Sequence, residues 1–318
     1  MNGVYDVVII GSGPAGLSAG IYSGRSRMST LLLEKQKVGG QAVVTNEIEN
    51  YPGAEEGETG PSLVAKMVKQ AERFGVERVS DKVTGVDFSG DVKKVIGGKG
   101  EYLARSVIVA SGAFPRMAGC KGEAEFTGKG VSYCATCDGA FFEGLEVFVV
   151  GAGDSAIQEA LFLTRFARKV TVIYRKGQDE MRAAKSLLQK AFENPKISFV
   201  YHSVVEEVRG DGGILDTIIV KDTQTGALTE FTADPDDETF GLFVFVGFIP
   251  QTEVFEGKIA MEGGYIPTDE YMRTNVPGVF AAGDCRKTTL RQVITAASDG
   301  AIAAVQAEKY IEHGKGGE

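Results

Sequence analysis

The sequence contains one local pattern twice: a short apolar run, a glycine-rich loop and then a stretch with helical spacing. The first apolar run is Tyr5–Ile10, and the loop G-S-G-P-A-G follows it. The second is Leu145–Val150, and G-A-G-D-S-A follows it. A buried strand that enters a helix through such a loop is typical of a dinucleotide-binding βαβ unit. The repeat therefore predicts an α/β protein with two Rossmann-like, FAD/NAD(P)-binding, three-layer domains.

The glycines of the first loop have separate roles. Gly11 allows the tight turn, Gly13 lets the backbone approach a pyrophosphate, and Gly16 lets the helix pack closely on the strand. The helix N-terminus, for which Pro14 is well suited, stabilises phosphate charge. The next apolar run ends at Glu34, where a carboxylate can accept hydrogen bonds from a ribose. FAD is the predicted ligand, and the candidate residues here are Gly11, Gly13, Pro14, Ala15, Gly16 and Glu34.

The second loop leads into different chemistry. The strand predicted for Lys169–Ile173 ends without an acid and continues as Y-R-K-G-Q-D-E-M-R. These cations suit a 2′-phosphate, so NADPH is the predicted ligand of this unit. A solvated surface loop is the alternative interpretation of the same charges. The candidate NADPH residues are Gly151, Gly153, Asp154, Ser155, Ala156, Arg175, Lys176 and Arg182.

A segment near the C-terminus belongs with the first unit. A strand is predicted for Val279–Ala281, and Asp284 lies just beyond its end, where an acid can bind a polyol chain. A helical run from Ile294 to about Tyr310 follows and can direct its N-terminus at a flavin. If this segment completes the first domain, the second domain is inserted into it. The predicted boundaries are 1–114 and 246–318 for the FAD-binding domain and 115–245 for the inserted NADPH-binding domain.

The stretch S-Y-C-A-T-C-D-G holds two of the four cysteines, Cys134 and Cys137. A zinc site would need two further ligands, and the other cysteines and the two histidines are isolated in the sequence. A C-x-x-C at the start of a helix brings two sulfurs within bonding reach and lowers a thiol pKa. We therefore predict a redox-active pair, with a pair of buried thiols as the alternative. Cys120 and Cys285 are interpreted as small buried residues.

Asp138 directly follows the second cysteine of the pair. If burial raises the pKa of its carboxyl group, Asp138 can donate and accept a proton beside the sulfurs. A helix-capping role is the alternative, and the two roles are compatible.

Composition restricts the possible partners. The chain carries 34 Lys and Arg against 43 Asp and Glu, a net charge of −9. That balance argues against nucleic-acid binding, which usually leaves a basic footprint. No apolar run reaches the ~18 residues of a membrane helix, and the N-terminus lacks a secretory signal, so a cytoplasmic location is predicted. The last residues, Gly314–Glu318, are expected to be disordered.

The order of these motifs resembles that of the low-molecular-weight thioredoxin reductases of bacteria, which are FAD-dependent pyridine nucleotide-disulfide oxidoreductases. The similarity runs nearly from end to end. The C-A-T-C-D element inside the second nucleotide unit is its most specific part. The other shared stretches are G-S-G-P-A-G, G-G-Q, E-N-Y-P-G, G-A-G-D-S-A, A-A-G-D and R-Q-V-x-T-A-A-x-D-G.

The resemblance implies a reaction sequence and a set of site residues. NADPH would reduce FAD, the flavin would open a Cys134–Cys137 disulfide through Cys137, and Cys134 would then attack the disulfide of thioredoxin. Asp138 would protonate the departing thiolate. The resemblance also implies a homodimer. It adds further candidates to the FAD site, namely Gly40, Gln41, Asn50, Gly112, Gly283, Asp284, Arg291, Gln292 and Val293.

This reaction sequence requires motion. The nicotinamide and the cysteines must reach the same flavin, and the cysteines must also reach an external protein. We therefore predict that the inserted domain rotates on its two crossings to the first domain, near Ser111–Pro115 and Phe245–Phe248. Both crossings are apolar runs that contain a glycine.

One departure from the family pattern concerns the electron donor. The family has His-Arg-Arg, three residues and then Arg, whereas this chain has Tyr174-Arg175-Lys176, five residues and then Arg182. Lys lacks the planar fork with which Arg binds a phosphate through two hydrogen bonds. NADPH remains the preferred donor. The alternative is a flavin disulfide reductase that uses ferredoxin or another donor, or that reduces a small-molecule disulfide.

Two further functions belong to other classes. A nucleotide-binding redox sensor would turn over slowly with every disulfide protein, and Cys134→Ser would then change partner binding rather than a rate. A ferredoxin–NADP reductase of the thioredoxin-reductase-like type would lack the C-A-T-C-D pair. The presence of that pair argues against the second of these functions.

Overall fold

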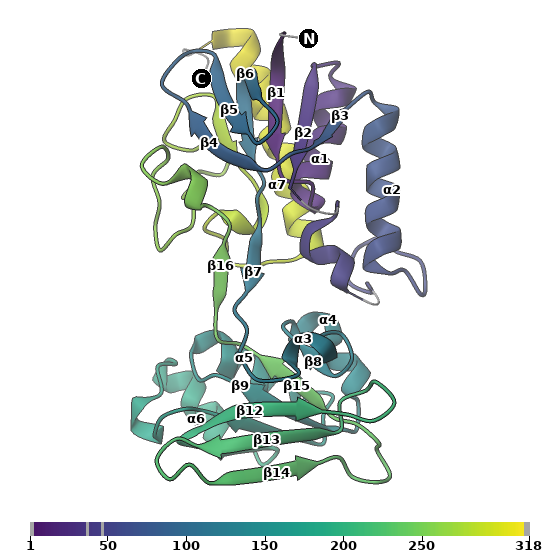
Figure 1. Ribbon diagram of the computed structural model, residues 1–318, viewed down its shortest axis with the longest axis vertical. Helices are drawn as coiled ribbons and strands as arrows, with labels where there is room; N and C mark the ends of the chain where they lie inside the picture. Colours follow the sequence, from purple (N-terminus) through teal and green to yellow (C-terminus); the bar gives the residue numbers. More distant parts are fainter. Residues whose placement is uncertain (1–2, 36–37, 46–47, 315–318) are drawn as a thin grey trace. The chain divides into compact units, whose positions relative to one another are not determined.

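The computed structural model describes residues 3–35, 38–45 and 48–314, so all but the first residue of the tail predicted to be disordered lies outside the described residues. The chain divides into two compact units (Figure 1). Unit 1 comprises Met1–Phe114 and Ile249–Glu318, and unit 2 comprises Pro115–Phe248. Unit 2 is thus inserted into unit 1, and its second border lies slightly after residue 245, where the sequence had suggested it.

Unit 1 is built on a sheet with strand order β3-β2-β1-β6-β5-β4, and β17 also pairs with β6. The strands β1, β2, β3, β6 and β17 run parallel to one another, so their carboxyl ends meet at one edge. The pairs β4–β5 and β5–β6 are antiparallel. The strands are β1 (Val4–Ile10), β2 (Thr30–Glu34), β3 (Glu77–Ser80), β4 (Val83–Asp87), β5 (Lys93–Gly97), β6 (Glu101–Val109) and β17 (Val279–Ala281).

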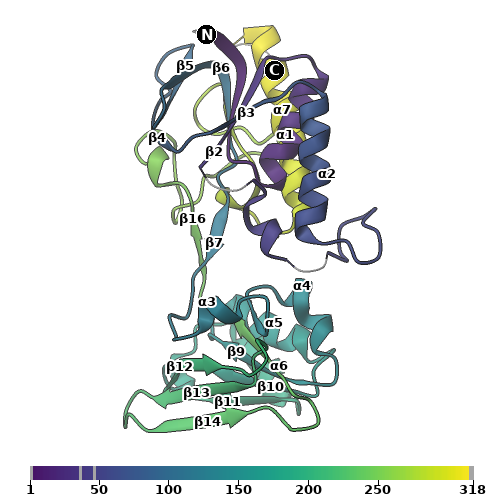
Figure 2. The ribbon, with the colours of Figure 1, turned by 45° about the vertical axis from the view of Figure 1, so that its right-hand side comes forward.

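Apolar side chains alternate between the two faces of this sheet, because successive residues of a strand point to opposite sides. Val7 and Ile9 of β1 pack into a core with the helices, whereas Val8 and Ile10 pack into a second core with Phe255. Figure 2 shows the helices together on one side of the strands. The helices of unit 1 are α1 (Pro14–Arg25), α2 (Gly60–Arg73) and α7 (Val293–His313).

Unit 2 has a parallel sheet with strand order β11-β10-β9-β15-β8 and an antiparallel sheet with order β12-β13-β14. One face of the parallel sheet packs on helices, and the other packs on the antiparallel sheet. The strands are β8 (Val131–Ser132), β9 (Glu146–Val150), β10 (Lys169–Ile173), β11 (Ile197–Val200), β12 (Ser203–Arg209), β13 (Thr217–Asp222), β14 (Leu228–Thr232) and β15 (Gly241–Val244).

The helices of unit 2 are α3 (Glu123–Phe126), α4 (Ala135–Asp138), α5 (Asp154–Leu163) and α6 (Lys185–Glu193). The two crossings between the units are β7 (Ala113–Pro115) and β16 (Phe248–Pro250), which pair with each other. Among the described residues, no helix is long and apolar enough to cross a membrane. The predicted fold class, α/β with two Rossmann-like three-layer domains and the second inserted into the first, is confirmed.

Candidate active site and nucleotide-binding sites

Cys134 and Cys137 are joined by a disulfide, with their Cα atoms 5.3 Å apart. Cys134 follows β8 and is the N-cap residue of the short helix α4. Its carbonyl oxygen accepts hydrogen bonds from the N–H groups of Cys137 and Asp138, at 3.3 and 3.1 Å. This single turn brings the two sulfurs together, so the C-x-x-C spacing alone accounts for the local geometry.

The Asp138 carboxyl group is hydrogen-bonded within the same turn. The Ser132 hydroxyl donates to Asp138 Oδ2 at 2.5 Å and accepts from the Cys134 N–H at 3.1 Å. Burial raises the pKa of Asp138, although the Ser132 hydrogen bond opposes that rise. Asp138 is the N-cap residue of the 3₁₀ helix Gly139–Phe142, but its side chain makes no capping hydrogen bond to that helix. The carboxyl group is bonded to Ser132 instead, an arrangement that suits the predicted proton transfer.

Ser132 is the residue of this site that sequence reasoning missed. It is almost fully buried at the end of β8. Its only signal in the sequence is its position two residues before Cys134, which does not distinguish it from an ordinary turn serine. A second hydroxyl, on exposed Thr136, lies 3.4 Å from Cys134 Sγ. Thr136 also lines a hollow of about 340 Å³ with Gln158, Glu159, Leu161, Phe162 and Arg165.

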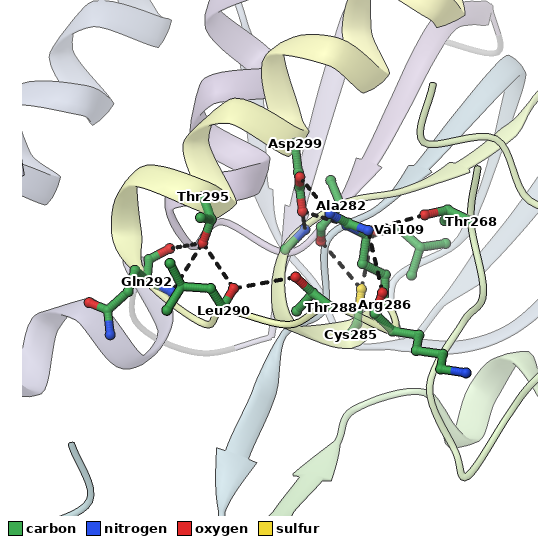
Figure 3. Close-up of polar contacts among 12 residues, drawn as sticks. Val109, Thr268, Ala282, Cys285, Arg286, Thr288, Leu290, Gln292, Thr295 and Asp299 are labelled. Carbon is green, nitrogen blue, oxygen red and sulfur yellow. Dashed lines mark hydrogen bonds and ion pairs between the residues drawn. The ribbon is translucent and has the colours of Figure 1, made fainter. Parts of the chain in front are cut away.

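The remaining two cysteines differ from each other. Cys285 is fully buried, and its thiol donates towards the carbonyl oxygens of Val109 and Ala282, as predicted for a small core residue (Figure 3). Cys120 is only half-buried because it lies in the loop before α3, which corrects the prediction. Desolvation and the neighbouring Glu123 carboxylate raise the pKa of Cys120 to about 12, so the thiol stays protonated at neutral pH.

The first glycine loop lies at the carboxyl edge of the unit 1 sheet. Gly11 has a φ of 106°, and a Cβ there would lie 2.3 Å from the Ala110 carbonyl oxygen, so only glycine fits. Gly13 is the N-cap of α1, and no described side chain caps this helix. Glu34 Oε2 accepts from the N–H and hydroxyl of Ser12, at 2.9 and 2.8 Å. Pro14 begins α1, and Ala15 and Gly16 are buried in its first turn.

Several of the predicted FAD residues meet at this edge. Asn50 Nδ2 donates to Gln292 Oε1 at 3.0 Å, which joins a loop before α2 to the N-cap of α7. A Cβ on Gly40 would lie 3.4 Å from the Cα of Gly13. The other candidates are Gln41, beside Gly40 in a 3₁₀ turn, Gly112, whose carbonyl oxygen accepts from Gln251, Arg291, which stacks on Tyr265, and Val293, the first residue of α7.

Asp284 lies in a 3₁₀ turn just beyond β17. Burial raises the pKa of its carboxyl group to about 6, and nearby Arg291 opposes the rise. Asp299 of α7 accepts from the Gly283 N–H at 3.0 Å and pairs with Arg286 at 2.6 and 2.9 Å (Figure 3). These contacts hold the turn against α7, so Asp299 positions the segment that carries Asp284.

The second glycine loop repeats the first. Gly151 has a φ of 125°, and a Cβ there would lie 2.5 Å from the Phe245 carbonyl oxygen. Gly153 is the N-cap of α5, no described side chain caps this helix, and a Cβ on Gly153 would meet no atom within 4 Å. Asp154 Oδ1 accepts from the Ala184 N–H at 2.7 Å. Ser155 is exposed and Ala156 is buried in the first turn of α5.

The segment after β10 contains an acid that pairs with one of its predicted phosphate-binding cations. Lys176 Nζ pairs with Glu180 Oε2 at 2.5 Å. The Arg182 N–H donates to the Ala152 carbonyl oxygen at 3.2 Å, so the segment adjoins the second glycine loop. Arg175 is exposed. The structure thus brings the predicted cations to the second loop and also places an acid on one of them.

Both glycine loops offer helix N-termini without a side-chain cap among the described residues, and the first lies beside an acid. Together with the cysteine pair, they define a class of protein with two dinucleotide-binding domains and one redox disulfide. Residues 5–300 match the family described as pyridine nucleotide-disulphide oxidoreductase.

Three similar proteins narrow this class. The chain is 58% identical to a thioredoxin reductase of Peptoclostridium litorale, over 98% of both chains. It is 44% identical to a thioredoxin reductase of Bacillus subtilis (strain 168), over 97% of this chain and 95% of the relative. The crystal structure of thioredoxin reductase from Streptococcus pyogenes MGAS5005 matches with a TM-score of 0.92 and 43% identity, over 98% of this chain and 100% of that one.

The chain therefore belongs to the pyridine nucleotide-disulphide oxidoreductase family and, within it, to the thioredoxin reductases. The predicted resemblance and the predicted Cys134–Cys137 disulfide are both confirmed.

Proposed function

We propose that the chain carries electrons from NADPH through FAD and the Cys134–Cys137 disulfide to a thioredoxin. One observation carries this proposal: a disulfide and a buried carboxyl group of raised pKa share a single helical turn. Such a pair suits thiol–disulfide exchange, because the leaving thiolate needs a nearby proton donor. The three similar proteins are thioredoxin reductases, which supports thioredoxin as the substrate.

The residues present fit both cofactors. For FAD, the Gly11–Gly16 loop and α1 would hold the pyrophosphate, Glu34 the ribose, and Asp284 with Gln292 the rest of the cofactor. For NADPH, the Gly151–Ala156 loop and α5 would hold the pyrophosphate, and the segment from Arg175 to Arg182 the 2′-phosphate. When bound, these two groups supply the electron pair that opens the disulfide.

The chain's own residues then manage sulfur and protons. Two electrons and two protons convert the Cys134–Cys137 disulfide to two thiols: the S–S bond breaks, Cys134 leaves as thiolate and takes a proton from the Asp138 carboxyl, and Cys137 takes the second proton from solvent. In the second half, Asp138 takes the Cys134 proton back, Cys134 Sγ attacks a thioredoxin sulfur, and Asp138 protonates the other thioredoxin sulfur, which is released as thiolate. Cys137 then loses its proton to solvent and attacks Cys134 Sγ, so the internal disulfide re-forms. The second thioredoxin sulfur leaves as thiolate and takes a proton from solvent, as does Asp138, so thioredoxin is released as a dithiol.

Unit 2 turns relative to unit 1 during this cycle. The support for this motion is that the chain crosses between the units only through β7 and β16 in the described residues, and that each crossing adjoins a glycine of positive φ. Gly112 has a φ of 71° and Gly247 a φ of 111°. A bifunctional reagent that locks the two units should stop turnover while FAD remains bound. Full turnover of the locked protein would contradict the rotation.

The test of the donor is an anaerobic titration. One equivalent of NADPH is added to the oxidised flavoprotein while the flavin absorbance is followed, with NADH as the comparison. Rapid bleaching by NADPH supports the proposed donor. A flavin that NADPH leaves unchanged, but that dithionite-reduced ferredoxin bleaches, would replace NADPH by ferredoxin and leave the thioredoxin half of the proposal standing.

The proposal extends to assembly and location. The homodimer follows from the family resemblance, whereas the cytoplasmic location follows from the sequence features described above. Sedimentation of the FAD-bound protein at micromolar concentration would test the dimer, and a monomeric mass would contradict it.

A further inference from the structure

We propose that Glu180 is a specificity-determining residue that acts as a built-in counter-anion at the 2′-phosphate site. By pairing with Lys176, it reduces the preference of this chain for NADPH over NADH. This inference rests on the proposed function, because it concerns the site that would bind the donor nucleotide.

The first step is that the segment adjoins the second glycine loop. The Arg182 N–H donates to the Ala152 carbonyl oxygen at 3.2 Å, and the Ala184 N–H donates to Asp154 Oδ1 at 2.7 Å. Asp154 begins α5, the helix whose N-terminus would face the pyrophosphate. Charges in this segment therefore lie within reach of a nucleotide bound at that loop.

The second step is that Glu180 is held towards Lys176. Residues Gln178–Glu180 form a 3₁₀ turn, and the buried Tyr174 donates its hydroxyl to the Glu180 carbonyl oxygen at 2.8 Å. The Glu180 carboxylate then lies 2.5 Å from Lys176 Nζ. The hydrogen bond from Lys176 lowers the pKa of Glu180, so this carboxylate is ionised at neutral pH.

The third step is the charge balance. The segment contains three cations, Arg175, Lys176 and Arg182, and two acids, Asp179 and Glu180. A 2′-phosphate dianion would have to displace Glu180 from Lys176 and would be repelled by it. A ribose 2′-hydroxyl meets neither cost. The five residues between Lys176 and Arg182 thus include an acid, Glu180, that lies at the proposed phosphate site.

The experiment measures nucleotide binding without turnover, by calorimetry on the FAD-bound protein. Adenosine 2′,5′-bisphosphate and 5′-AMP are compared, because they differ only in the 2′-phosphate. We expect Glu180→Gln to tighten binding of the bisphosphate by about twofold to fivefold, since exposed charge pairs have effects of this size. Binding of 5′-AMP should change by less than about twofold.

Asp179→Asn is the matched control, because it removes the same charge one residue away. It should tighten the bisphosphate by clearly less than Glu180→Gln does. Lys176→Gln should weaken the bisphosphate more in the Glu180→Gln background than in the wild type, because the lysine is then released for the phosphate. This coupling distinguishes a direct pair from a general change in surface charge.

The outcomes separate the inference from the proposed function. If both ligands bind but Glu180→Gln and Asp179→Asn act equally, or if neither changes the bisphosphate, Glu180 has no special role and the inference is wrong. If neither ligand binds the wild type or Glu180→Gln, the second loop is no nucleotide site, and NADPH as the donor is wrong together with the inference.

Discussion

Both glycine loops turn at a first glycine of positive φ, which is 106° at Gly11 and 125° at Gly151, and both turns pass close to a carbonyl oxygen of a neighbouring strand end. Beyond the turn they differ. In unit 1 the acid Glu34 is bonded to the loop residue Ser12 through both its N–H and its hydroxyl. In unit 2 the basic segment contains its own acid, and Lys176 is bonded to that acid.

The difference shows what a shared loop determines and what it leaves open. The turn and the uncapped helix N-terminus suit any pyrophosphate. We expect the identity of the bound nucleotide to depend on the residues at and just after the end of the next strand. In unit 1 this residue is Glu34, which is hydrogen-bonded to the loop, whereas in unit 2 Arg175 and Glu180 are exposed. We therefore expect the FAD site to tolerate little change and the donor site to be easily retuned by substitution.

The largest expected effect separates chemistry in unit 2 from cofactor binding in unit 1. Cys134→Ser should lower kcat for thioredoxin reduction by about a thousandfold or more, because it removes the proposed attacking sulfur and the internal disulfide can no longer form. The flavin content of the purified protein should equal that of the wild type. Steady-state turnover measures the first property, and the ratio of absorbance at 450 nm to that at 280 nm measures the second.

A redox sensor would respond differently to the same substitution. It would show slow turnover in the wild type and altered partner binding in Cys134→Ser. Turnover by the wild type that is fast and lost in the variant would exclude that function.

The next effect compares the two loops directly. Gly11→Ala should destabilise the protein by about 2–4 kcal/mol and release FAD, because the new Cβ would meet the Ala110 carbonyl oxygen in a backbone conformation that alanine avoids. Gly151→Ala should have a similar cost in unit 2 but leave FAD bound. Thermal unfolding and flavin content check both. Loss of FAD from Gly151→Ala as well would break the assignment of one cofactor to each unit.

Much of this arrangement follows from local sequence. The loops, the strands before them and the Cys134–Cys137 turn are each determined by residues within one short segment, so pattern and spacing are sufficient. The sequence suggested that unit 2 ends at residue 245, near the glycine that closes an apolar run, whereas the unit ends at Phe248. The crossing lies in β16, which forms by pairing with β7, a strand far away in the sequence.

The contacts that tune the sites could not be predicted in the same way. Arg286 meets Asp299 across a turn and a long helix, and Lys176 meets Glu180 only because a 3₁₀ turn lies between them. Ser132 bonds Asp138 through a hydroxyl that resembles any turn serine in the sequence. Such pairings depend on how the backbone elements are placed in three dimensions, and residue spacing along the chain does not predict that placement.

A smaller effect tests the hydrogen bond beside the disulfide. Ser132→Ala removes the bond that lowers the Asp138 pKa, so that pKa should rise further. In the reduced protein, the rate of alkylation of Cys134 by iodoacetamide should then rise at a higher pH than in the wild type. At pH values below this rise, the rate should be lower by about tenfold. Ser132→Thr, which keeps the hydroxyl, should restore the profile.

Thr136→Ala is the matched control for this prediction. Its hydroxyl lies 3.4 Å from Cys134 Sγ, so its loss should alter the alkylation rate without moving the pH at which that rate rises. Identical profiles for Ser132→Ala and Thr136→Ala would mean that Ser132 acts on the fold of the turn rather than on Asp138.

The smallest expected effect concerns Asp284, the buried acid of unit 1. Its folded-state pKa of about 6 lies above the ordinary 3.8, so the charged form is disfavoured by folding. The protein without FAD should therefore lose stability as pH rises from about 4 to about 6. Asp284→Asn should abolish that loss, with no effect near pH 3.5 and a gain of at most about 3 kcal/mol at pH 7, measured by thermal unfolding.

With FAD bound, the sign of this effect should reverse. If the carboxylate of Asp284 accepts hydrogen bonds from the cofactor, these bonds offset the cost of burying its charge. Asp284→Asn should then weaken the binding of FAD by about tenfold at pH 7. A variant that is stabilised equally with and without FAD would show that Asp284 is a buried acid of the fold with no contact to the cofactor. Binding of FAD would then depend on the glycine loop and Glu34. The expected intolerance of the FAD site to substitution would apply only to that loop.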